Sequence, residues 1–292
     1  MTILVTGSTG TIGSLVVRHL ADRGAAVRAL VRDPAKAQLP AGATPVKGDL
    51  SDVDAMRAAL AGTDTLFLLN AVVPDELTQA LITLNLARDA GIKRVVYFSV
   101  FNGDIFTDVP HFSAKHTAER MIEQFDIPAT VLRPAYFMQN DLSLKEALLS
   151  HGAYPMPIGG VGVAMADARD IAEVAALSLI RREGAAEPLP CETIEIVGPD
   201  SLTGDALAAI WSDVLGRPVS YAGDGLDAFE QQSRARMRGW MAYDMRTMVR
   251  GFQRDGMVAK PGNLDRLTGM LGRPLRTYRD FARETATLWQ AA

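Results

Sequence analysis

Three glycines, each three residues from the next, stand near the start of the chain between a short apolar run and an amphipathic stretch. Glycines in this pattern let the chain turn sharply, bring its backbone against a pyrophosphate and pack the next helix close to a sheet. The amides at the start of that helix then face the phosphates. The segment therefore predicts a dinucleotide-binding loop, and a glycine-rich turn without a ligand is the alternative. Its residues are Thr6, Gly7, Ser8, Thr9, Gly10, Thr11, Ile12 and Gly13.

A basic residue stands where an acidic one would mark an NAD site. In NAD-binding folds of this kind, a carboxylate about 20 residues after the loop accepts hydrogen bonds from the ribose hydroxyls. Here the apolar run Ala26–Val31 ends at Arg32, and Asp33 and Lys36 follow. A guanidinium holds a 2′-phosphate through paired hydrogen bonds, so Arg32 and Lys36 predict NADP(H) in preference to NAD(H). Asp33 keeps the NAD(H) alternative open, and a solvated surface arginine is the other interpretation of Arg32.

Two further segments follow apolar runs and are expected to line the groove that binds the dinucleotide. Gly48-Asp49-Leu50 comes after the third predicted strand, where the Asp49 carboxylate is placed to accept from an adenine amino group. Asn70 and Ala71 close the fourth strand. Both assignments rest on topology, because ligands of parallel sheets lie at the carboxyl ends of the strands.

Alternating strands and helices must position these loops. Apolar runs without period-two patterning alternate with longer segments of helical period, which indicates a parallel sheet covered on both faces. We therefore predict an α/β protein with a Rossmann-like, doubly wound parallel sheet. Besides the third strand, which precedes Gly48, the predicted strands are Ile3–Val5, Ala26–Val31, Thr65–Leu69, Val95–Val100 and Ala129–Leu132. The predicted helices are Ile12–Arg23, Val53–Leu60 and Leu77–Ala90.

The sequence pattern changes after about residue 141. Loop-rich sequence is followed by a predicted helix over Asp167–Ile180, a predicted strand over Thr193–Val197 and a mostly helical remainder. We predict an NAD(P)-binding Rossmann domain over residues 1–150 and a smaller, mostly helical substrate-binding region over 151–292. Elements at about 161–182 and 192–198 are expected to return to the first domain.

The composition of the 292 residues argues against several classes of protein. Hydrophobic residues make up 48% and charged residues 22%, as in ordinary globular proteins. The net charge of −4 argues against a nucleic-acid partner. A single cysteine, Cys191, and four scattered histidines give no reason to expect a disulfide framework or a metal. Without a leader pattern or an apolar stretch near the roughly 20 residues of a membrane span, we expect a cytoplasmic protein with no membrane association.

Several segments resemble the atypical short-chain dehydrogenase/reductases, specifically the NmrA-like group, which includes quinone oxidoreductases and redox-sensing regulators. The resemblance implies a nicotinamide pocket formed by Ser99, Lys115 and the segment that contains Pro134, Tyr136 and Phe137. The resembling segments are the loop Thr6–Gly13, Gly48–Leu50, Val95–Ser99, His111–Glu119, Leu132–Asn140, Ala168–Ala172 and Leu215–Pro218.

One position departs from the pattern of that group. Short-chain dehydrogenases usually carry a tyrosine four residues before the lysine as the acid or base of carbonyl reduction, and this chain has His111 there. The resemblance implies that Lys115 hydrogen-bonds the nicotinamide ribose, whereas a solvated helix lysine paired with Glu119 is the alternative. His111 is a candidate general acid because an unperturbed histidine has a pKa of about 6.5. A substrate contact and a structural residue after Pro110 are its other interpretations.

Two tyrosines are conceivable substitutes for the missing proton donor. Tyr97 lies within a predicted buried strand, which favours core packing, whereas Tyr136 follows the end of a strand on the nicotinamide side. The catalytic candidates are therefore Lys115, His111 and Tyr136.

Some hydride acceptors need little help from an acid. A quinone, enone, imine or azo group delocalises the charge it gains, so the protein contributes mainly proximity and orientation. We therefore expect an NADPH-dependent oxidoreductase that reduces a flat, conjugated small molecule. The alternative is a non-catalytic NADP(H)-binding redox sensor that acts through a protein partner, and a homodimer is compatible with either. The partner surface would be formed by Arg234, Arg236, Arg238, Arg246, Arg250 and Arg254, for which a solvated helical face is the other interpretation.

Overall fold

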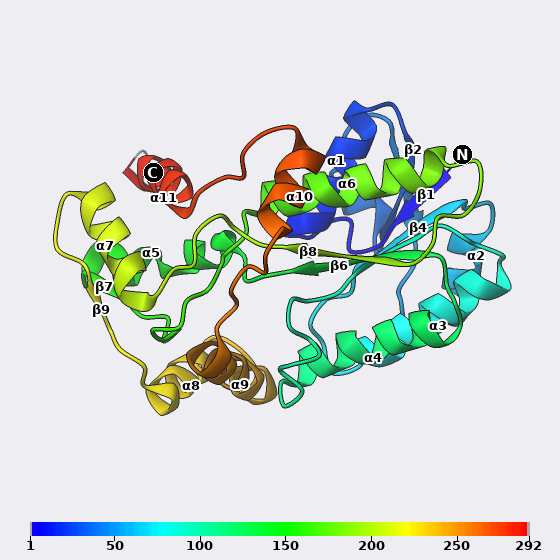
Figure 1. Ribbon diagram of the computed structural model, residues 1–292. Helices are drawn as coiled ribbons and strands as arrows, with labels where there is room; N and C mark the ends of the chain where they lie inside the picture. Colours follow the sequence, from blue (N-terminus) through cyan, green and yellow to red (C-terminus); the bar gives the residue numbers. More distant parts are fainter. Residues whose placement is uncertain (1, 291–292) are drawn as a thin grey trace. The chain divides into compact units, whose positions relative to one another are not determined.

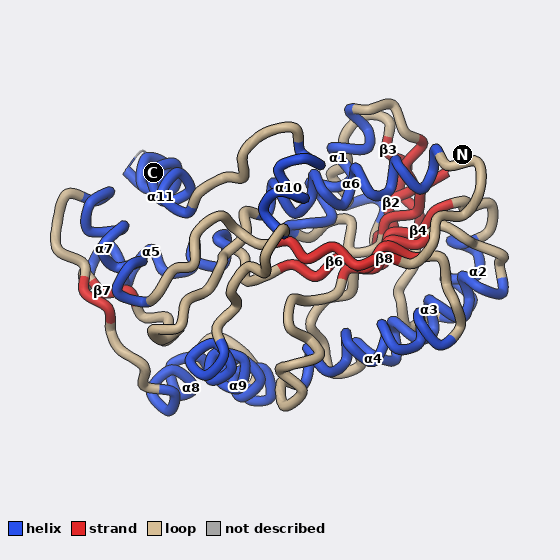
Figure 2. Tube along the Cα trace, viewed as in Figure 1, coloured by secondary structure: helices blue, strands red, loops and turns tan. Residues whose placement is uncertain are grey.

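A seven-stranded sheet organises the fold in the computed structural model, which describes residues 2–290. Its order is β3-β2-β1-β4-β5-β6-β8, and the neighbours from β3 to β6 pair in parallel (Figure 2). The direction of winding reverses between β1 and β4, which confirms the predicted doubly wound α/β sheet. The strands are β1 Thr2–Val5, β2 Ala26–Val31, β3 Ala43–Lys47, β4 Thr65–Leu68, β5 Val95–Phe98, β6 Ala129–Pro134 and β8 Glu192–Ile196.

Helices cover both faces of this sheet. Figure 1 shows α1 and α6 on one face and α2, α3 and α4 on the other. The second face packs on a core that includes Leu66, Leu84 and Ile122. Such continuous apolar strands are expected of a parallel sheet buried on both sides. The helices are α1 Thr11–Asp22, α2 Val53–Leu60, α3 Glu76–Asp89, α4 Pro110–Gln124 and α6 Ala168–Gly184.

The chain divides into two compact units and passes between them several times. The first, called the sheet unit here, comprises Met1–Asp104, His111–Arg133 and Arg169–Glu195. The second, called the helical unit, comprises Ile105–Pro110, Pro134–Ala168 and Ile196–Ala292. Its elements are the 3-10 helix η2 Met138–Leu144, α5 Lys145–Ser150, β7 Ala153–Tyr154, α7 Gly204–Leu215, β9 Ser220–Tyr221, α8 Leu226–Arg234, α9 Gly239–Asp255, α10 Asn263–Leu271 and α11 Tyr278–Gln290.

The parallel sheet brings the predicted loops to one edge. The residues that follow β1, β2, β3, β4 and β5 all leave the sheet at the carboxyl ends of the strands, where ligands of such sheets bind. No helix in the described part of the chain is long and apolar enough to cross a membrane.

Candidate functional site

The loop after β1 is folded so tightly that two of its glycines have no room for a side chain. Gly7 has a φ of +60°, and a Cβ added there would lie 2.1 Å from Leu69 Cδ2. A Cβ added at Gly13 would lie 2.1 Å from the Gly7 carbonyl oxygen, which also accepts the Gly10 amide at 3.0 Å. The close turn predicted from the glycine spacing is therefore present.

Helix α1 starts directly after this turn, and its N-cap residue makes no side-chain hydrogen bond to the first amides. Gly10 occupies the N-cap position and offers no side-chain acceptor. The first amides of a helix have no partner within it, and together with the helix dipole they form an anion site. Ser8 lies in the loop, but its hydroxyl donates to the Leu30 carbonyl oxygen at 2.6 Å. Ser8 therefore ties the loop to β2, while Thr9 and Thr11 are exposed.

At the end of β2, the Asp33 carboxylate is turned toward its own backbone. It accepts the Ala35 amide at 3.1 Å as the N-cap of the 3-10 helix η1 Pro34–Lys36, and it lies 3.3 Å from Lys36 Nζ. Arg32 is exposed and has no ion pair within residues 2–290. The guanidinium is thus without a partner among the described residues at this point, whereas the carboxylate already has two contacts.

Asp49 follows β3 and lies within the electrostatic influence of Arg32. Its carboxylate accepts from the Ser51 hydroxyl at 2.6 Å and from the Ser51 amide at 3.0 Å. These hydrogen bonds, and to a smaller extent the charge of Arg32, hold the pKa of Asp49 below its usual range. Leu50 is half-buried beside it.

Asn70, after β4, is a buried amide with unused hydrogen-bonding capacity. Its side chain is 6% exposed, and neither its oxygen nor its nitrogen has a partner among the described residues. An unsatisfied buried polar group costs about 1–3 kcal/mol, so an amide kept in this state is suited to a ligand. The adjacent Ala71 is exposed. The Asn70 side chain therefore has donors and an acceptor that a polar molecule at this edge could use.

Lys115 pairs with a residue that the sequence analysis did not consider. Its Nζ atom lies 2.6 Å from Oε1 of Glu76, the first residue of α3, and both side chains are buried. The alternative of a solvated lysine paired with Glu119 is wrong, because tertiary packing places Glu76 against it. Glu76 looks in the sequence like an ordinary acidic residue in a first helical turn.

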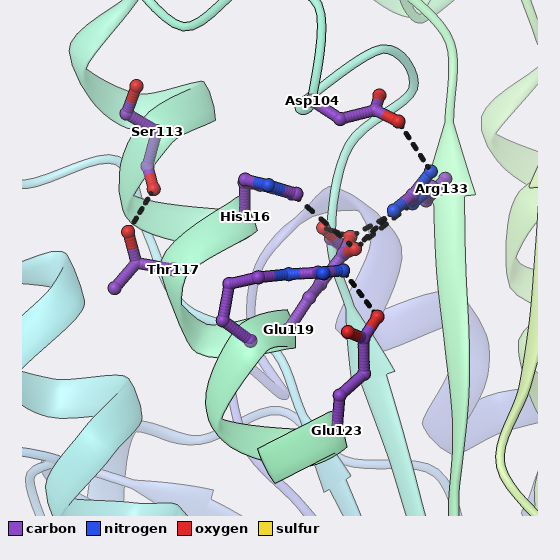
Figure 3. A network of polar contacts seen from close by, with 9 residues as sticks. Asp104, Ser113, His116, Thr117, Glu119, Glu123 and Arg133 are labelled. Carbon is purple, nitrogen blue, oxygen red and sulfur yellow. Dashed lines mark hydrogen bonds and ion pairs between the residues drawn. The ribbon is translucent and has the colours of Figure 1, made fainter.

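Glu119 is bound instead by Arg133 and Ser99. Figure 3 shows Arg133 of β6 facing Glu119 of α4, with Asp104 on the other side of the guanidinium. Arg133 Nε donates to both carboxylate oxygens of Glu119 at 3.1 and 3.2 Å, and its Nη2 also contacts Oε2. The Ser99 hydroxyl donates to Oε1 of the same carboxylate. Because this hydroxyl has one proton, Ser99 can offer a ligand only an acceptor.

The remaining sheet-unit candidates are His111 and a residue that sequence reasoning missed. His111 is half-buried near the start of α4, and its ring packs edge-on against Phe112 with centroids 4.7 Å apart.

Asn102 lies in the loop after β5 and is 7% exposed. Its φ is +58°, and its side-chain oxygen has no partner in the described chain. Non-glycine residues in this backbone region occur preferentially at functional sites, but nothing in the sequence marks the position.

Tyr136 and its neighbours Pro134 and Phe137 belong to the helical unit. The Tyr136 ring lies edge-on to Phe252, with centroids 5.7 Å apart. Burial, and then the negative charge of Asp141, raise the pKa of Tyr136 above its usual range. Tyr136 is therefore a hydrogen-bond donor and a poor acid.

The arginines of α8 and α9 are mostly neutralised within the helical unit. Their partners are Glu230 for Arg234, Asp227 for Arg246, Asp108 for Arg250 and Asp255 for Arg254. This pairing favours the interpretation of a solvated helical face.

A Rossmann-type sheet with a glycine turn and an open helix start defines a dinucleotide-binding class of fold. The model of the NmrA-like family matches residues 1–281, and the chain belongs to that family, as its motifs suggested. It is 32% identical to an NAD(P)H azoreductase of Xenophilus azovorans over 99% of this chain and 100% of that protein. It is 31% identical to quinone oxidoreductase 2 of Escherichia coli over 75% of this chain and 76% of that one. A crystal structure of the NADPH-dependent quinone oxidoreductase from Escherichia coli complexed with NADPH gives a TM-score of 0.86, at 26% identity and with 97% and 99% of the two chains covered.

Proposed function

We propose that the protein binds NADP(H) at the carboxyl edge of the sheet. The glycine turn and the first amides of α1 would receive the pyrophosphate. Asp49 and Leu50 would line the adenine side, and Asn70, Ala71, Ser99 and Lys115 the nicotinamide side. The partnerless amide of Asn70 supports this assignment.

Preference for NADP(H) over NAD(H) is proposed from the end of β2. The Asp33 carboxylate, which would bind the ribose hydroxyls of NAD, is engaged with the Ala35 amide and Lys36. Arg32 is exposed beside it and would bind a 2′-phosphate through paired hydrogen bonds.

We propose that the activity is reduction of a flat, conjugated small molecule of the quinone, enone, imine or azo type. The observation that carries this proposal is the commitment of the Ser99 proton to Glu119. Position 111 carries a histidine in place of the usual tyrosine. Neither position 99 nor position 111 therefore offers a hydroxyl proton to a substrate carbonyl. A conjugated acceptor does not need one, since the charge it gains is delocalised. Bound NADPH would supply the hydride, and the chain would supply proximity and orientation. The names of two relatives, an azoreductase and a quinone oxidoreductase, denote acceptors of this type.

The test combines cofactor binding with turnover by the purified protein. NADPH and NADH are titrated by nicotinamide fluorescence, and cofactor oxidation is then followed with quinones, azo dyes and, as a control, unconjugated ketones. We expect tighter binding of NADPH than of NADH and turnover of conjugated acceptors alone. Tight NADPH binding without turnover of any acceptor would contradict the reductase and favour the redox sensor. Comparable turnover of simple ketones would contradict the argument from Ser99.

A further inference from the structure

Lys115 and Glu76 form a buried pair of opposite charges that joins α4 to the first turn of α3. Their side chains are 7% and 3% exposed, and Nζ and Oε1 lie 2.6 Å apart. An apolar pair of similar volume often stabilises a protein as well as a buried ion pair does. Stability alone therefore does not account for a carboxylate at this position.

The charge on Lys115 matters because nicotinamide changes its own charge during the reaction. The ring is neutral in NADPH and positive in NADP+. An uncompensated ammonium beside the ring would disfavour NADP+ and so oppose hydride donation. A carboxylate bound to that ammonium removes most of this bias.

We propose that Glu76 is a positioning residue that neutralises and orients the Lys115 ammonium, so that Lys115 can bind the nicotinamide nucleotide without discriminating against its oxidised form. The proposal rests on the proposed function, because it requires Lys115 to lie beside the nicotinamide ribose. An ammonium has three donors, so an ion pair with one carboxylate oxygen leaves donors for ribose hydroxyls. The start of α3 is also where the helix dipole favours a negative charge.

Neither of two other ionisable neighbours, Glu119 and Tyr97, takes over this role. Glu119, one turn further along α4, is bound by Arg133 and Ser99. Tyr97 of β5 stays a neutral phenol, because burial first, and then the charges of Glu76 and Glu119, raise its pKa well above the usual range.

The test is the ratio of the Kd for NADP+ to the Kd for NADPH, measured by fluorescence for NADPH and by competition for NADP+. Glu76→Gln leaves the ammonium without its carboxylate, and we expect this ratio to rise about tenfold. One unit charge acting over about 10 Å at an effective dielectric constant of about 20 has an effect of this size. Glu76→Asp keeps the charge and is expected to restore most of the wild-type ratio. Lys115→Met leaves the carboxylate alone and is expected to lower the ratio.

Controls separate this role from a structural one. Glu187→Gln, at an exposed position of the same unit, is expected to leave the ratio unchanged. If both Kd values rise equally in Glu76→Gln, Glu76 is only structural and the proposal is overturned. If Glu76→Gln does not fold, Lys115→Met is compared with the double variant Glu76→Gln/Lys115→Met, in which the ratio should return to the wild-type value. Equal ratios in those two variants overturn the proposal, whereas a wild-type protein that binds neither nucleotide overturns the proposed function itself.

Discussion

Three buried carboxylates, two in the sheet unit and one in the helical unit, are held in different ways. In the sheet unit, Glu76 faces Lys115 and Glu119 faces Arg133, so these two buried carboxylates each have a positive partner. In the helical unit, Asp141 is fully buried and has no cationic partner within the described chain. Asp141 is thus held by neutral donors, whereas Glu76 and Glu119, which are about as deeply buried, are paired with cations.

The neutral donors around Asp141 are aromatic. Its Oδ2 atom accepts from the Tyr154 hydroxyl at 2.9 Å and from the Tyr278 hydroxyl at 2.5 Å, and Trp211 Nε1 donates to the Tyr278 oxygen at 2.9 Å. Burial raises the pKa of Asp141 to about 6, and the two tyrosine hydrogen bonds oppose this shift only in part. A carboxyl held in this way titrates close to neutral pH. The comparison teaches that neutral hydrogen-bond donors alone offset the effect of burial on a carboxyl group only in part.

The largest expected effect follows from removing Arg133, the cation that pairs with Glu119 in the sheet unit. Arg133→Met leaves Glu119 buried and unpaired, and we expect the free energy of unfolding to fall by about 3–5 kcal/mol. Urea unfolding measures this loss. The double variant Arg133→Met/Glu119→Gln removes the stranded charge and should recover part of it. A loss below about 1 kcal/mol would show that charge pairing does not hold Glu119 and would remove the contrast with Asp141.

A smaller effect is expected from the pH dependence of Asp141. Its pKa is raised from 3.8 to about 6 in the folded protein, so between about pH 4 and 6 the native state binds more protons than the unfolded state. The free energy of unfolding therefore falls as the pH rises through this window, by about 2–3 kcal/mol from this group. Asp141→Asn should lack that component, so urea unfolding at several pH values should show wild type losing stability relative to the variant from pH 4 to about 6.5.

Tyr154→Phe sharpens this experiment. It removes one of the hydrogen bonds that lower the pKa of Asp141, so the upper limit of the window should move to higher pH. Identical pH profiles for wild type and Asp141→Asn would contradict the assignment.

Local sequence signals were enough for the architecture. The apolar run Ala26–Val31 and the helical segment Val53–Leu60 have in the structure the bounds that the pattern predicts. The glycines of the first loop are required by backbone contacts within a few residues and by the close approach of Leu69. Strand order follows from the regular alternation of elements, since parallel connections have few alternatives.

The partners of the charged side chains could not be predicted in the same way. Lys115 and Glu119 are one helical turn apart and predict a local pair, yet each binds a residue on another element. Such choices depend on where α3 and β6 place Glu76 and Arg133 after the sheet has formed. The unusual backbone of Asn102 likewise arises from its loop and leaves no mark in the composition.

The smallest expected effect is that of removing a surface ion pair. The charged atoms of this pair lie about as close together as those of Lys115 and Glu76. Arg234 Nη2 lies 2.7 Å from Glu230 Oε1 on α8, but 57% of the arginine side chain is exposed. Solvent screens such a pair, so Arg234→Ala should change the free energy of unfolding by less than about 0.5 kcal/mol, and high salt should abolish even that difference. Urea unfolding at low and high salt checks both points. A loss comparable to that of Arg133→Met would mean that proximity of charges, and not burial, sets the cost of removing one.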